Sequence, residues 1–219
     1  HRASSLRSNE SGTTAHFALP GSLDEDTPGL FHGSTFGTGS WRDALDADAV
    51  CILVDATRLT AADTEAKSAP LVAFDRHVES LFIAIQRWRS RGGRPTLHPI
   101  FVPSQFDAVK PSVLQAARLD GAPPEIAKTA ARQAYARALL ASNLPKTLAA
   151  VEKGSGPKLR FAGPEYFFSW VRTETRAADA SRRIRLRQID GGGWEPDYPR
   201  EEYVALLEAL GDVAAAEKA

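Results

Sequence analysis

The polar segment Ser104-Gln105-Phe106-Asp107 follows the apolar run 99–102, with only Pro103 between them. A carboxylate placed just after a buried strand can accept two hydrogen bonds from an amidine-like edge, such as the N1–H and N2–H₂ groups of guanine. In parallel α/β sheets, ligands bind beyond the carboxyl ends of the strands. Asp107 is therefore the first candidate for ligand binding, and Ser104 and Gln105 lie beside it.

The elements that must position these residues alternate between strands and helices. Apolar runs predict buried strands over 49–54, ending at Asp55, over 99–102, and over 166–168, ending at Ser169. Apolar residues at helical spacing predict helices over about 71–88, 111–119, 124–140, 145–152 and 200–211. This alternation predicts a three-layer α/β fold, with a mainly parallel sheet and helices on both faces.

The composition is that of an ordinary globular protein and excludes several function classes. The 219 residues include 27 Lys and Arg against 27 Asp and Glu, 43% hydrophobic residues and 25% charged residues. The neutral balance argues against a dedicated nucleic-acid binder. No apolar run approaches the roughly 18–20 residues of a membrane span. One cysteine and no signal peptide favour a cytoplasmic protein.

The chain is expected to form one domain over 15–219, preceded by a disordered or frayed segment over 1–14. The first residue is His1, and the 219 residues contain no Met. We therefore expect a fragment, in which the domain is incomplete at its N-terminus.

The string 99–109 resembles the base-recognition element of GTPases, in which Asn/Thr-Lys-x-Asp follows a strand. The resemblance puts Asp107 on the guanine-reading aspartate, Ser104 on the Asn/Thr position and Gln105 on the lysine, whose charge glutamine lacks. Ser169-Trp170 resembles the Ser-Ala loop, in which a backbone N–H contacts the guanine oxygen. The family prefers alanine at the position of Trp170.

A second set of motifs concerns the phosphates. Asp26-Thr27-Pro28-Gly29 resembles the Asp-x-x-Gly switch element, in which the aspartate meets Mg²⁺ through water and the glycine N–H meets the γ-phosphate. No Gly-x-x-x-x-Gly-Lys-Ser/Thr occurs in the 219 residues. The resemblance therefore implies either a phosphate loop (P-loop) before His1 or a degenerate domain that never had this loop.

The chain is most similar to divergent bacterial P-loop GTPase-like domains of the translation-factor-like class, including the double-GTPase type. The resemblance implies a guanine-nucleotide-binding domain, such as a regulatory switch in a bacterial system, that uses GTP or GDP with Mg²⁺. GTP hydrolysis would require the P-loop, and the sequence identifies no catalytic residue. A protein partner of unknown identity is also expected. The alternative is a non-catalytic interaction module that has lost nucleotide binding, which Gln105 and Trp170 favour.

Two other polar sites have alternative interpretations. Asp55 and Thr57 follow a core strand, where they either cap the next turn or hold a metal as in von Willebrand A-type domains. Leu59 breaks the metal motif Asp-x-Ser-x-Ser, so capping is preferred. The five histidines have no metal-ligand spacing, so no metal site is expected.

The remaining candidates favour structural roles. Cys51 lies inside an apolar run and is expected to be a small buried core residue. Arg183, Arg185 and Arg187 alternate with Ile184 and Leu186, which predicts a half-exposed edge strand over 183–189. Together with Arg172, Arg176 and Arg182, these arginines form a basic stretch that either protects this edge in solvent, the preferred interpretation, or docks a phosphate or an acidic partner.

Overall fold

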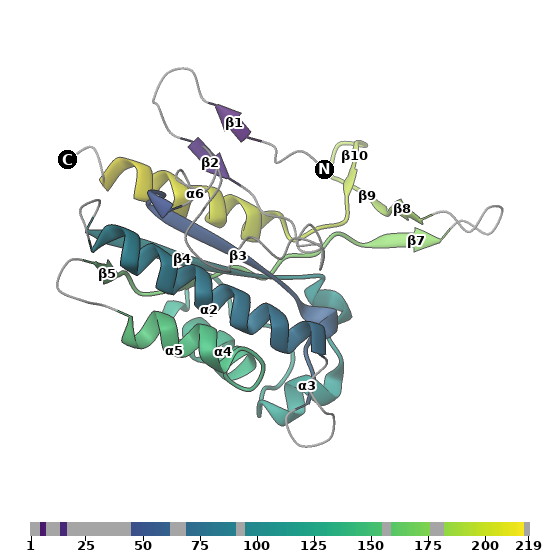
Figure 1. Cartoon of the computed structure of the whole chain (residues 1–219). Helices are drawn as coiled ribbons and strands as arrows, with labels where there is room; N and C mark the ends of the chain where they lie inside the picture. Colours follow the sequence, from purple (N-terminus) through teal and green to yellow (C-terminus); the bar gives the residue numbers. More distant parts are fainter. Residues whose placement is uncertain are drawn as a thin grey trace.

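The structure is a computed structural model that describes residues 5–7, 14–16, 45–61, 69–90, 95–154, 159–175 and 182–216. Its central element is a small parallel sheet (Figure 1). Strand β3 (Ala49–Asp55) pairs with β4 (Thr96–Ser104) in a register that runs from Ala49 opposite His98 to Asp55 opposite Ser104. The predicted first and second strands are confirmed, and β4 is longer than expected.

The other side of β4 is occupied by two short parallel strands. These are β5 (Arg160–Phe161) and β6 (Glu165–Tyr166). The pairing with β4 continues past β6, because Phe167 N–H donates to Phe101 O at 2.9 Å and Ser169 N–H donates to Pro103 O at 2.9 Å. The third predicted strand is therefore confirmed as an extended segment that reaches Ser169.

Helices cover both faces of this sheet. They are α2 (Ala69–Arg89), α3 (Pro111–Ala116), α4 (Thr129–Ala141), α5 (Pro145–Lys153) and α6 (Arg200–Ala216). Figure 1 shows α2, α4 and α5 on one side of the sheet and α6 on the other. The expected α/β class with a mainly parallel sheet and helices on both faces is confirmed.

The alternation of side chains along the strands produces two cores. On the α2 side, Ile52, Phe101 and Phe168 pack into the larger hydrophobic cluster. On the α6 side, the smaller cluster is built from Ile100, Val102 and Phe167, with Leu206 and Leu210 of α6 packed against it. Because both faces of β4 are buried over residues 99–103, this part of its sequence is continuously apolar rather than alternating.

Two helix boundaries differ from the prediction. Helix α4 begins at Thr129 rather than at 124, because the carbonyl of Pro124 lies in a loop where it accepts a hydrogen bond from Arg132 Nη1 at 2.8 Å. Helix α6 continues through Gly211 to Ala216. Gly211 costs this helix only about 1 kcal/mol relative to alanine, which the apolar packing of α6 offsets.

Four short strands extend beyond the sheet as two hairpins (Figure 1). Strand β7 (Thr173–Thr175) pairs antiparallel with β8 (Arg182–Ile184), and β9 (Leu186–Gln188) pairs antiparallel with β10 (Trp194–Pro196). The predicted single edge strand over 183–189 is therefore wrong, because the chain changes partner at Arg185. We call β7 to β10 the β-arm.

Near the N-terminus, β1 (Ser5–Arg7) and β2 (Thr14–His16) pair antiparallel. The sequence predicted a disordered or frayed segment over 1–14, within which β1 lies. Among the helices that the structure describes, none has the length and apolar character needed to span a bilayer.

Candidate functional site

The carboxyl ends of the strands bring the predicted base-site residues together. Ser104 ends β4, and the N–H of Phe106 donates to the carbonyl of Ser169 at 3.1 Å. This bond joins the loop after β4 to the loop that follows β6. Ser104, Gln105 and Asp107 therefore share one edge of the sheet with Ser169 and Trp170.

The loop after β4 is shaped by one buried aromatic residue. Phe106 is buried and makes an edge-to-face contact with Phe168, with ring centroids 4.7 Å apart. Gln105 precedes it with φ of 53°, a left-handed backbone conformation that costs on the order of 1 kcal/mol in a residue with a Cβ. A 3₁₀ turn, η2 (Phe106–Ala108), follows. With Phe106 held inward, its neighbours Gln105 and Asp107 lie at the surface.

The Asp107 carboxylate faces an arginine from the segment after β6. Arg172 Nε lies 3.9 Å from Asp107 Oδ2, and Arg172 Nη1 lies 3.5 Å from Asp197 Oδ2. Arg185 Nε lies 3.7 Å from the same oxygen of Asp197. Arginine and carboxylate groups thus alternate from the candidate base site to the β-arm. The Asp107–Arg172 pair was not predicted from the sequence.

The arginines of the basic stretch whose side chains the structure describes lie next to carboxylates. Arg187 pairs with Glu195 through Nη2 and Oε1 at 2.7 Å, across the β9–β10 ladder. Arg183 lies opposite Glu174 in the β7–β8 register. These pairs make a phosphate-docking role for the stretch the weaker interpretation.

Asp55 is a capping residue, as preferred from the sequence. Its Oδ1 accepts the backbone N–H of Thr57 at 3.0 Å and the Thr57 hydroxyl at 2.6 Å. Arg58 Nε lies 3.1 Å from its Oδ2. Both carboxylate oxygens are therefore used by the 3₁₀ turn η1 (Ala56–Arg58). Within the described ranges, no group of three or more His, Cys, Asp and Glu residues could hold a metal ion.

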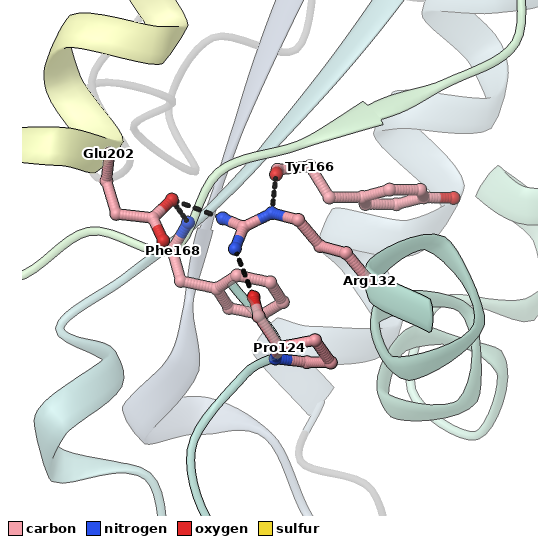
Figure 2. Close-up of polar contacts among 5 residues, drawn as sticks. All are labelled: Pro124, Arg132, Tyr166, Phe168 and Glu202. Carbon is pink, nitrogen blue, oxygen red and sulfur yellow. Dashed lines mark hydrogen bonds and ion pairs between the residues drawn. The ribbon is translucent and has the colours of Figure 1, made fainter. Parts of the chain in front are cut away.

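A buried ion pair that the sequence did not reveal lies beside the end of β6 (Figure 2). Arg132 on α4 binds Glu202 on α6, although the two residues are 70 positions apart. Arg132 Nε also donates to Tyr166 O at 2.9 Å, and Phe168 N–H donates to Glu202 Oε2 at 2.9 Å. The Arg132 guanidinium carbon lies 4.9 Å from the centroid of the Phe168 ring.

This ion pair satisfies backbone groups on the outer edge of the sheet. The N–H groups of Phe167 and Ser169 point to β4, so the alternate groups, Tyr166 C=O and Phe168 N–H, point away from it. A further strand would normally satisfy these two groups. Here Arg132 supplies the donor and Glu202 the acceptor. The ion pair therefore makes the hydrogen bonds that a neighbouring strand would otherwise make with Tyr166 C=O and Phe168 N–H.

Burial shapes the ionisation of several groups near these sites. Burial raises the pKa of Glu202, while Arg132 and the Phe168 N–H act in the opposite direction. Burial also raises the pKa of Tyr166 to about 12 and that of Cys51 to about 11. Cys51 packs against the smaller core cluster but is only partly buried, so the prediction of a small buried core residue is confirmed in its packing and not in full burial.

Two predicted residues cannot be compared with the structure. Asp26 and Gly29, the candidate switch residues, lie outside the described residues. The Gly-rich segment 33–40 lies outside them as well. The carboxyl-edge residues 104–107 and 169–170 therefore form the candidate site.

Comparisons with protein-family models, curated proteins and solved structures give no match for this chain. The described fold belongs to the α/β class with a mainly parallel sheet. The interpretation of the carboxyl edge therefore depends on its geometry and on the motif resemblance.

Proposed function

We propose that this protein binds a guanine nucleotide at the carboxyl edge of its sheet, with Asp107 reading the base. The observation that carries the proposal is the hydrogen bond from Phe106 N–H to Ser169 O at 3.1 Å. It holds the Asp107 loop and the Ser169-Trp170 loop side by side, which is what recognition of a single base by both loops requires.

The chemistry of the two loops is complementary to guanine. The Asp107 side chain is 29% exposed, so its carboxylate is partly accessible to the N1–H and N2–H₂ groups of a base. Ser169 N–H is used inside the sheet by Pro103 O. Among the described residues of this loop, the next N–H, that of Trp170, is the donor available to the guanine oxygen.

The order of the elements also supports the proposal. Strands β3, β4 and β6 lie in chain order in the sheet, α2, α4 and α5 cover one face, and α6 covers the other. The candidate loops follow the second and third of these strands, and ligands of parallel α/β sheets bind beyond the carboxyl ends of the strands.

The proposal concerns recognition of the guanine base and does not extend to GTP hydrolysis. The 219 residues contain no Gly-x-x-x-x-Gly-Lys-Ser/Thr, and Asp26 and Gly29 lie outside the described residues. The described chain therefore offers no residue for which a role at the phosphates or at Mg²⁺ can be argued.

The test is the substitution Asp107→Asn, with affinities for GDP and xanthosine diphosphate measured by calorimetry. Loss of a hydrogen bond to a charged group costs about 1.5–3 kcal/mol, so GDP affinity should fall by about ten- to a hundredfold while that for the xanthine nucleotide rises. Asp120→Asn, at an exposed position between α3 and α4, is the matched control. Unchanged GDP affinity in Asp107→Asn would show that Asp107 does not read the base.

The alternative, an interaction module without nucleotide chemistry, is favoured by one feature of the β-arm. Ile184, Leu186 and Trp194 are all more than half exposed there. Large exposed apolar side chains that gather in one region are typical of protein-binding surfaces. If the wild-type chain and every base-site variant fail to bind guanine nucleotides, this second interpretation is preferred.

A further inference from the structure

We propose that Arg172 is a gate on the base site, which competes with guanine for the carboxylate of Asp107. This inference rests on the proposed function and adds a residue that sets the affinity of that site. Arg172 Nε lies 3.9 Å from Asp107 Oδ2, on the carboxylate that would bind the base.

The chemistry of the competition is direct. A guanidinium presents a planar set of N–H donors, and the N1–H and N2–H₂ groups of guanine form a similar planar fork. A carboxylate that binds the fork of a base in bidentate fashion uses both oxygens. Arg172 Nε lies beside one of these oxygens, so Arg172 and the base compete for it.

The backbone of Arg172 is fixed at the root of the β-arm, while its side chain has a second partner. Its N–H donates to Asp197 O at 2.9 Å, and its carbonyl accepts the N–H of Arg185 at 2.8 Å. Asp197 Oδ2 lies 3.5 Å from Arg172 Nη1. When a base displaces the guanidinium from Asp107, Arg172 remains paired with Asp197, so the gate opens at little cost.

Exposure sets the size of the effect. The Arg172 side chain is 48% exposed and that of Asp107 is 29% exposed, so solvent screens their attraction. Exposed ion pairs of this kind change an equilibrium by about two- to fivefold. The gate therefore tunes affinity and does not close the site completely.

The experiment compares GDP and guanosine binding to the wild-type chain, Arg172→Gln, Asp107→Asn and the control Arg183→Gln. Arg183 lies in the same basic stretch but opposite Glu174, in the β7–β8 hairpin. Calorimetry measures the GDP affinity, and NMR shift titration measures that of guanosine, which has no phosphates to interact with an arginine. Thermal unfolding checks that each variant is folded.

Arg172→Gln should tighten the binding of both ligands by about two- to fivefold, while Arg183→Gln leaves it unchanged. Binding by Arg172→Gln but not by the wild type would also support the gate. If Asp107→Asn loses GDP but Arg172→Gln binds no better than wild type, the gate is wrong and the proposed function stands. If no protein in the set binds either ligand, the proposed function fails, and the gate fails with it.

Discussion

Asp75 on α2 caps α5 from a neighbouring helix: its Oδ1 accepts the backbone N–H of Thr147 at 2.9 Å. Its Oδ2 accepts the N–H of Lys146 at 3.2 Å. Leu144, at the N-cap position of α5, supplies no side-chain hydrogen bond, so the cap must come from elsewhere in the fold. The Asp75 carboxylate therefore accepts two N–H groups that would otherwise lack a partner at the start of α5. It also links α2 to α5.

Replacement of Asp75 by alanine should lower the free energy of unfolding by about 1–2 kcal/mol, the cost of losing a helix cap. Asp75→Asn should cost less, because the amide oxygen still accepts one of the two N–H groups. Urea unfolding followed by circular dichroism measures both. Asp120→Ala, at an exposed position, should change stability by less than about 0.5 kcal/mol. An equally small effect of Asp75→Ala would show that the cap contributes nothing.

The ion pair between Arg132 and Glu202 should show strong coupling in a double-mutant cycle. Arg132→Met or Glu202→Leu alone leaves a buried charge without its partner, which costs about 3–5 kcal/mol. The double variant should be more stable than the sum of the single changes predicts, because no unpaired charge remains. Additive effects would mean that the two residues act independently.

Cys51 should react slowly with thiol reagents in the folded protein. Burial raises its pKa to about 11 from 9.0, so at pH 8 the thiolate is about a hundredfold scarcer than in the unfolded chain. Since the pKa is higher in the folded state, stability should also fall as the pH rises from 9.0 toward 11. Iodoacetamide labelling followed by mass spectrometry, with and without urea, measures the difference. Equal labelling rates would place the thiol at the surface.

Gly154, which follows α5, occupies a position without room for a side chain. A Cβ there would lie 2.6 Å from Phe161 Cε2 and 2.0 Å from Ala150 O. Gly154→Ala should therefore lower the melting temperature, through overpacking that costs about 1–3 kcal/mol. Gly163→Ala is the matched control, because a Cβ at Gly163 meets nothing within 4 Å. Similar melting temperatures for the two variants would contradict the crowding at Gly154.

The sequence was most informative where a residue's role depends on its near neighbours. The continuous apolar runs of β3 and β4 predicted their burial, because a strand covered on both faces has no polar side. Asp55 was identified as a cap because its partner, Thr57, is two residues away. The meeting of the 104–107 and 169–170 loops followed from parallel topology, since carboxyl ends share one edge.

The sequence was least informative where partners are distant along the chain. Arg132 and Glu202 lie on separate helices, and neither helix pattern distinguishes a buried charge from a solvated one. The contact between Arg172 and Asp107 depends on how the chain turns after β6. The sequence did not indicate that the strand predicted over 183–189 is divided at Arg185. Residues of β8 and β9 form one alternating pattern, although the two strands pair with different partners.

The bonded outer edge at 166–168 also determines how this sheet can meet other chains. An open edge strand offers free N–H and C=O groups that can recruit a strand from another molecule, which leads to aggregation or domain swapping. Arg132 and Glu202 form hydrogen bonds with these edge groups, in a segment that contains two phenylalanines, Phe167 and Phe168. The same ion pair that joins α4 to α6 is thus a barrier to self-association, and a variant that lacks it would be prone to aggregate even while it remains folded.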